Sequence, residues 1–244
     1  MSLHETEALV LKSYPLAEAD KIVVFLTRSH GIVRGVAKGA KRLTSRFGGS
    51  LEPFSIVRLE FFQSGERELV TIKQVDIIES LFRHASDPSL LAELAAIPDI
   101  LTGFSPPADP DDRLYRMTRG VVSQAMADGA TADALIVYFE FWVLQLGGFM
   151  PSWSACSHCG REFDETEDAS LRSDFRLSCG VCERVRQQSS VSAGIRSAYR
   201  AARTMPPEQF AAYGAENETD VLVLRGFLRQ MIAMLLGREA GARA

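Results

Sequence analysis

The chain has 244 residues, of which 46% are apolar and 24% are charged, and its formal net charge is −4. This composition is typical of a folded globular protein with one large or two modest domains, and the acidic balance argues against a surface that binds nucleic acid throughout. The longest apolar stretch, residues 134–146, contains Glu140 and Gln145 and is too short to cross a bilayer.

Five segments rich in Val, Ile, Phe and Thr follow one another at short spacing in the first 80 residues. Turn-forming residues separate them, and the pattern predicts five β-strands. These strands are residues 6–13, 21–27, 31–38, 54–62 and 68–79. Five strands in so short a segment favour a small closed barrel, and the oligonucleotide-binding (OB) fold is the common soluble barrel of this size that handles nucleic acid.

Basic residues are concentrated in one part of this barrel. Residues 21–51 contain seven basic side chains and no acidic one, whereas acidic residues gather in 109–112 and 162–168. A basic stretch on an acidic protein favours docking of a polyanion on one surface. The candidate phosphate-binding residues are Arg34, Lys38, Lys41, Arg42 and Arg46, with Arg28 and Lys12 as weaker candidates.

The alternation of the third strand places these charges. Arg34 and Lys38 share its outward face, while Val33, Gly35 and Ala37 share the face that fits a tight barrel interior. The outward face continues into a Gly-rich basic loop, residues 39–49, which could close over a phosphate backbone. Phe47 in this loop has two interpretations: it stacks on a base, or it packs on the rim of the barrel.

After residue 80 the apolar spacing changes to three and four residues, which is typical of helices. The predicted helices are residues 89–103, 112–127, 131–146, 191–203 and 220–236. The segment 131–146 is apolar on nearly all sides, so we expect it to be the central buried helix. Gly147 and Gly148 are expected to end it.

All four cysteines lie in two Cys-x-x-Cys pairs with 19 residues between the pairs. Two residues between thiolates let one tight turn direct both sulfurs at one ion, and this spacing is typical of a structural four-cysteine zinc site. The ligands are Cys156, Cys159, Cys179 and Cys182. Gly160 and Gly180 stand where a positive φ or a close backbone approach to sulfur is often needed.

Other interpretations of the cysteines fit less well. A redox pair would need one Cys-x-x-Cys in a βαβ setting, and disulfides would suit a secreted chain, whereas the first residues do not form a signal peptide. His158 could replace one thiolate as a ligand. Reduced cysteines and the missing targeting segment favour a cytoplasmic protein without membrane contact.

No catalytic constellation is apparent. The chain lacks a phosphate-binding Gly-x-x-x-x-Gly-Lys motif, a Gly-x-Ser-x-Gly nucleophile turn and a His-Glu-x-x-His metal motif. His30 and His84 are interpreted as isolated turn or surface residues. We therefore expect a protein that is not an enzyme.

Two segments carry a family resemblance. Gly31-Ile-Val-Arg-Gly-Val-Ala-Lys-Gly-Ala-Lys-Arg42, followed by Gly49-Ser-Leu-Glu-Pro-Phe54, resembles the signature of the RecO family of bacterial DNA repair and recombination proteins. The segment Tyr138–Pro151, followed by Cys156-x-x-Cys-Gly160, is similar to the central helix and zinc motif of that family. After Arg42 the loop departs from the family pattern, because Leu43 and Thr44 stand where further basic residues are expected.

The resemblance implies a non-enzymatic recombination mediator with one structural Zn²⁺. Such proteins bind single- and double-stranded DNA, anneal complementary strands and help RecR to load recombinase on DNA coated with single-strand-binding protein. They also contact the C-terminal tail of that coating protein. In the cell we expect the chain in the cytoplasm and on the nucleoid when it is bound to DNA. The alternative is a zinc-stabilised protein–protein adaptor without direct DNA binding.

Together these observations predict an α+β multidomain protein. An N-terminal five-stranded OB-fold β-barrel is followed by an α-helical domain that carries an inserted four-cysteine zinc-binding module. The expected segments are the barrel in 1–80, the first part of the helical domain in 81–150, the zinc module in 151–184 and the second helical part in 185–244.

Overall fold

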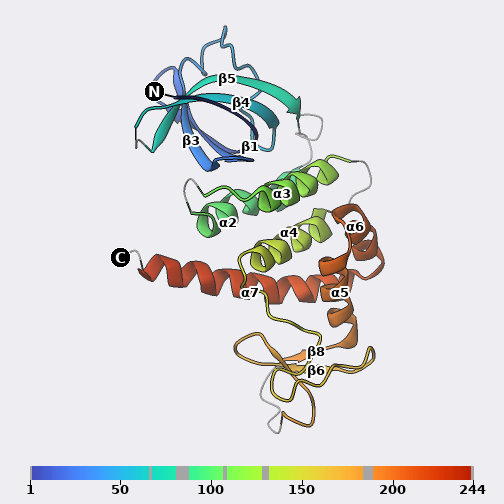
Figure 1. Ribbon diagram of the computed structural model, residues 1–244. Coiled ribbons are helices and arrows are strands. Elements are labelled where there is room, and N and C mark those ends of the chain that lie inside the picture. Colours follow the sequence, from blue (N-terminus) through green and yellow to red (C-terminus); the bar gives the residue numbers. More distant parts are fainter. Residues whose placement is uncertain are drawn as a thin grey trace. The chain divides into compact units, whose positions relative to one another are not determined.

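The computed structural model of the protein describes residues 2–65, 68–80, 88–106, 109–127, 132–183 and 189–242 (Figure 1). The chain divides into two compact units, Met1–Met126 and Ala127–Ala244. The first unit holds the strands β1–β5 and the helices α1–α3, and the second holds α4–α7 and a small sheet. The expected boundaries at residues 80, 150 and 184 stay a prediction, and His84, Thr131 and Arg184 lie outside the described residues.

Five strands form the predicted barrel. They are β1 (Ser2–Leu16), β2 (Asp20–Thr27), β3 (Gly31–Ala37), β4 (Ile56–Gln63) and β5 (Leu69–Glu79). The order β1-β2-β3-β5-β4 closes because β1 also pairs with β4, and only β3 and β5 run parallel. A register shift between Val10 and Lys12 lets the long β1 serve both neighbours.

The interior of the barrel follows the predicted alternation of β3. Val33 and Ala37 belong to the buried core and Gly35 is buried, while Arg34 and Lys38 are exposed. A side chain at Gly35 would collide with the buried side chains of β5, because an added Cβ would lie 2.7 Å from Ile72. The small residues of β3 therefore have a steric reason, and the outward placement of the two cations is confirmed.

Three helices accompany the barrel in the first unit: α1 (Pro88–Leu94), α2 (Ala96–Phe104) and α3 (Asp112–Ala125). One continuous helix was expected over 89–103, and this prediction is wrong. Pro98 lacks the N–H that a continuous helix would bond to the carbonyl of Leu94, whereas the first turn of a new helix needs no such donor. The chain therefore ends one helix at Leu94 and begins another at Ala96.

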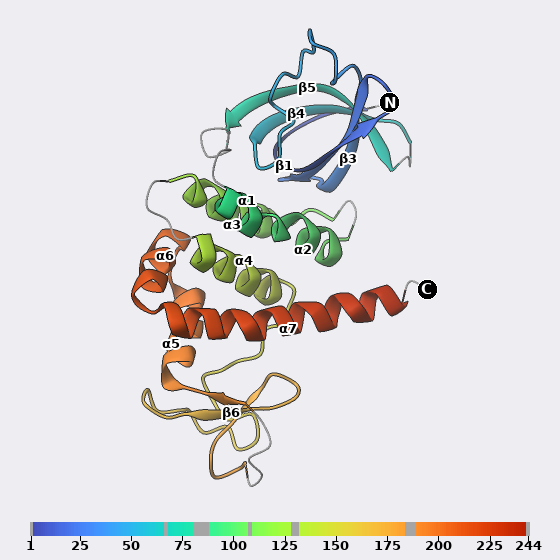
Figure 2. The same cartoon turned by 180° about the vertical axis from the view of Figure 1, so that it is seen from behind.

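The second unit is built around α4 (Ala132–Leu146), which is buried on nearly all sides as predicted. It packs against α6 (Pro207–Glu216) and α7 (Glu218–Ala242), and α5 (Ala193–Thr204) packs against α7 (Figures 1 and 2). Gly148 has φ of 75°, and the N–H of Phe149 bonds to the carbonyl of Leu144, so the glycine pair ends α4 as expected. The helix α6 was not predicted.

The cysteine module lies between α4 and α5 in the sequence and contains a small antiparallel sheet. Its strands are β6 (Ala169–Leu171), β7 (Leu177–Ser178) and β8 (Ser190–Val191), in the order β7-β6-β8. Helices that pack together thus precede and follow the module, which confirms its insertion into a helical domain. Within the described ranges, every helix is too short or too polar to cross a lipid bilayer.

Candidate metal centre and nucleic-acid interface

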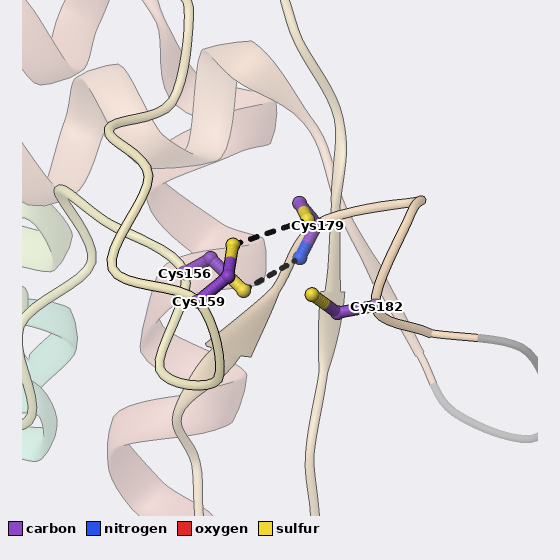
Figure 3. A group of neighbouring side chains, drawn as sticks. All are labelled: Cys156, Cys159, Cys179 and Cys182. Atoms are coloured by element: carbon purple, nitrogen blue, oxygen red, sulfur yellow. Dashed lines mark hydrogen bonds between the residues drawn. The ribbon is translucent and has the colours of Figure 1, made fainter.

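The four cysteines come together as their spacing predicted (Figure 3). Their sulfur atoms all lie within 4.8 Å of one another, and the Sγ atoms of Cys159 and Cys179 are 3.9 Å apart. Four sulfurs around a tetrahedral ion at the usual Zn–S bond length would be about 3.8 Å apart. The donor set and its dimensions therefore fit a metal ion of the size of Zn²⁺. His158 is exposed and is not part of the cluster, so His158 does not replace a thiolate.

Tight turns in the backbone aim the thiols. In the first turn the N–H of Gly160 donates to the carbonyl of Cys156, and Gly160 has φ of 74°, as expected for a glycine there. In the second turn the N–H of Cys182 donates to the carbonyl of Cys179. Gly180 is different: its φ is not positive and an added Cβ would meet no atom within 4 Å. The expectation for Gly180 is therefore wrong.

The electrostatics of the cluster favour a bound cation. The backbone N–H of Cys182, above all, lowers the pKa of Cys179 to about 6. Burial opposes ionisation of Cys156, but the N–H groups of Cys159 and Cys179 outweigh it and lower the pKa of Cys156. Side-chain hydrogen bonds to Cys159 and Cys179 raise the pKa of Cys182 to about 12. Because one thiol must stay protonated beside thiolates, a dication would be needed to ionise all four.

Aromatic side chains attach the module to α5. The indole of Trp153 is buried and stacks on the ring of Tyr199, with the ring centroids 5.1 Å apart. The Trp153 N–H donates to the carbonyl of Phe175, and the Tyr199 hydroxyl donates to the carbonyl of Pro151. The metal centre is thus connected to the helical core by packing as well as by the chain.

The predicted phosphate-binding residues fall into two groups. Five of them are exposed and, within the described ranges, form no ion pair; we call them the basic surface: Arg34, Lys38, Lys41, Arg42 and Arg46. The two weaker candidates each face a carboxylate. Lys12 is half-buried and pairs with Asp99, and Nε of Arg28 lies 2.7 Å from Oδ1 of Asp112. The structure therefore leaves the charge of the first group uncompensated.

The basic loop, residues 39–49, is an ordered succession of turns. The N–H of Gly39 donates to Oδ1 of Asp20, and the N–H of Lys41 donates to the carbonyl of Ala19. In both cartoons the connection between β3 and β4 rises from the side of the barrel away from α2 and α3 (Figures 1 and 2). No helix of its own unit covers the loop there.

Phe47 is not available for base stacking. Its side chain is only 3% exposed and belongs to the core of the barrel, so the second of its two interpretations is correct. The guanidinium of Arg46 lies over this ring, 4.9 Å from the centroid. Phe47 therefore holds the end of the loop down and orients Arg46 at the surface.

Three features of the first unit were missed by sequence reasoning. Nε2 of His30 lies 3.2 Å from Nδ1 of His4, so the interpretation of His30 as isolated is wrong. Oε1 of Glu7 on β1 accepts hydrogen bonds from Tyr115 and Arg119 and fastens α3 to the barrel. Leu43 is fully exposed in the basic loop. Only for Leu43 did the sequence hold a signal, an apolar residue where basic ones were expected.

Family models match both parts of the chain. Residues 1–81 match the N-terminal model of recombination protein O, and residues 85–242 match its C-terminal model. The chain belongs to the RecO family. This membership confirms the resemblance and places the chain among DNA repair and recombination proteins.

Two relatives show how far the similarity extends. A DNA repair protein RecO of Koribacter versatilis (strain Ellin345) is 34% identical over 67% of this chain and 66% of its own length. A DNA repair protein RecO of Myxococcus xanthus (strain DK1622) is 30% identical over 98% of this chain and 95% of its own length. The second match includes the barrel, the helices and the cysteine module.

Proposed function

We propose that this RecO-family chain is a non-enzymatic mediator of DNA repair and homologous recombination that binds single- and double-stranded DNA without sequence preference. The observation that carries the proposal is the basic surface, a set of exposed cations without carboxylate partners on one strand and loop of an OB-like barrel. Such cations displace condensed counterions from phosphates, which supplies affinity for any sequence.

Strand annealing follows from the same contacts. Cations that neutralise phosphates lower the repulsion between two strands, and contacts restricted to the backbone leave the Watson–Crick edges free to pair. The annealing of complementary strands, the loading of recombinase together with RecR and the contact with the C-terminal tail of single-strand-binding protein belong to this proposal. So does a location in the cytoplasm, with association to the nucleoid when DNA is bound.

The metal in this proposal is one structural Zn²⁺. Cys156, Cys159, Cys179 and Cys182 would hold it, and a coordination sphere filled by four thiolates leaves no position for a substrate. The ion would stabilise the turns of the module. The residues Trp153 and Tyr199 would then transmit that order to α5.

Fluorescence anisotropy of labelled oligo-deoxythymidine, titrated at several salt concentrations, tests the proposal. If the five cations of the basic surface each neutralise one phosphate, log K should fall against log salt with a slope of about −3.5 for single strands. An oligonucleotide of another sequence should bind equally well. Absence of binding at low salt would contradict the proposal and favour a zinc-stabilised protein–protein adaptor.

A further inference from the structure

Leu43 is the most exposed large apolar side chain of the described residues. Its accessibility is 108% of the reference value, so it packs on no part of its own chain. The residues beside it, Lys41, Arg42 and Thr44, are exposed as well. An apolar side chain thus stands alone among cations at the free end of the basic loop.

The backbone holds this position in place. The N–H of Arg42 donates to the carbonyl of Gly39 at 3.1 Å, and the N–H of Ser45 donates to the carbonyl of Arg42 at 2.9 Å. The side chain of Lys41 reaches back to the carbonyl of Ala17. Because hydrogen-bonded turns precede and follow Leu43, the loop presents the isobutyl group outward rather than folding it onto the barrel.

We propose that Leu43 is a wedge that inserts between neighbouring bases of a single DNA strand while Lys41 and Arg42 hold the phosphates on either side. This inference rests on the proposed DNA binding and adds to it a residue that acts on the bases. Apolar side chains that enter a base step and unstack it are a known device of DNA-binding proteins. Bases in a single strand are cheaper to separate than those in a duplex, because no base pair has to open.

The surroundings of Leu43 favour a nucleic acid over a protein groove as the occupant. An apolar groove deep enough for Leu43 would also have to receive the two adjacent cations, Lys41 and Arg42, which have no carboxylate partner in the described part of the chain. A DNA strand offers both chemistries at once, with anionic phosphates outside and apolar base faces between them. With Phe47 buried, Leu43 is the apolar group of the basic loop that can reach a base.

The experiment separates binding from unstacking. Single-stranded deoxyadenosine oligomers carrying 2-aminopurine, whose fluorescence is quenched by stacking, are titrated with the full chain while anisotropy is recorded in parallel. Wild type should bind and brighten the 2-aminopurine. Leu43→Ser should bind with a Kd changed by less than about threefold, since phosphate contacts carry the affinity, but should lose most of the brightening. Leu43→Met, which keeps an apolar side chain, should retain it.

The matched control is Leu222→Ser, which removes an exposed leucine from α7 in the other unit and should alter neither signal. Equal brightening by wild type and Leu43→Ser would overturn the wedge, as would wild-type binding without any brightening. A loss of brightening in both Leu43→Ser and Leu222→Ser would overturn it too. Failure of wild type to change the anisotropy at low salt would instead contradict the proposed DNA binding itself, so the two failures are distinguishable.

Discussion

The imidazole of His30 lies against the imidazole of His4, with Nε2 of the first 3.2 Å from Nδ1 of the second, and both rings contact Phe61. The remaining ring nitrogens face serine hydroxyls, since Ser2 contacts His4 and Ser29 contacts His30. One imidazole must accept the hydrogen bond that the other donates. The pair therefore cannot persist when both rings are protonated.

This arrangement predicts a loss of stability in mild acid. Burial, and then repulsion from His4, lowers the pKa of His30 below its ordinary value of 6.5. At higher pH both the folded and the unfolded chain hold a neutral His30, so the pair contributes fully. As the pH falls below 6.5 the unfolded chain binds the proton first, and stability decreases until the pH reaches the lower pKa of the folded state.

The measurement is thermal unfolding of wild type and His30→Gln between about pH 7.5 and about pH 5. The variant should be less stable at the upper end, and the difference in unfolding free energy should shrink toward the lower end. Carboxylates titrate in both proteins, so the comparison isolates the imidazole. A difference that is constant with pH would show that the pair does not titrate as inferred.

Removing two cations of the basic surface should weaken DNA binding in a countable way. Lys41→Gln combined with Arg42→Gln removes two of five phosphate contacts, so the salt slope for single strands should change from about −3.5 to about −2.1. Annealing of complementary oligonucleotides should slow in parallel. Anisotropy titrations at several salt concentrations, with the same protein in an annealing assay, measure both effects.

A control with the same change of net charge is available on the same barrel. Arg58 and Lys73 pair with Glu5 and Glu60 and lie outside the basic stretch. Arg58→Gln combined with Lys73→Gln should leave the salt slope unchanged. If both double variants reduce the slope equally, binding depends on overall charge and the assignment of the basic surface is wrong.

Sequence patterns predicted the barrel well because its information is local. The five strands alternate, and the small residues of β3 show which face is inside, so the sequence alone was sufficient to place Arg34 and Lys38 outward. The cysteine spacing was equally sufficient, since two short turns determine where four sulfurs point. The break before α2 was also encoded, in Pro98, although an apolar period of three and four residues concealed it.

Other features depend on contacts between distant residues. The strands β6–β8 have only two or three residues each, too few to show an alternation. The pairing of His4 with His30 needs the register of β1 and the turn after β2 together. Phe47 reads as an exposed aromatic in a polar loop, and only the space inside the barrel decides that it is buried.

Loss of one thiolate should release the metal and loosen the module. Cys156 is buried and accepts the N–H of Cys179, so Cys156→Ser changes the centre of the cluster. Zinc-finger peptides gain roughly 10–16 kcal/mol from their ion at neutral pH, and a serine hydroxyl does not replace a thiolate ligand. We expect stoichiometric zinc in the wild type, little in the variant, and new proteolytic cuts within residues 151–183.

His158→Ala is the matched control for this experiment, because His158 is exposed, lies between two ligands and is outside the sulfur cluster. It should keep its zinc and its resistance to protease. A Cys156→Ser protein that lacks metal yet remains resistant would show that the packing of Trp153 on Tyr199 is sufficient to fold the module.

Two arginines one turn apart on α5 should differ sharply in their contribution to stability. Arg196 is buried, its guanidinium donates to the carbonyls of Asp164 and Glu167, and it lies 5.2 Å from the ring centroid of Phe163. Arg200 is exposed and only pairs with Glu165, at 3.1 Å. Arg196→Met leaves two carbonyls without their donor and should lower the free energy of unfolding by roughly 2–4 kcal/mol.

Arg200→Met should cost less than about 1 kcal/mol, because exposed ion pairs gain little against solvent and side-chain entropy. Urea unfolding of both variants, followed by tryptophan fluorescence, measures the difference, since Trp153 lies in the same module. Equal effects of the two substitutions would mean that charge near the acidic segment matters more than burial. A large effect confined to Arg196→Met would instead identify its guanidinium as the hydrogen-bonded anchor that holds the acidic segment 164–167 against α5.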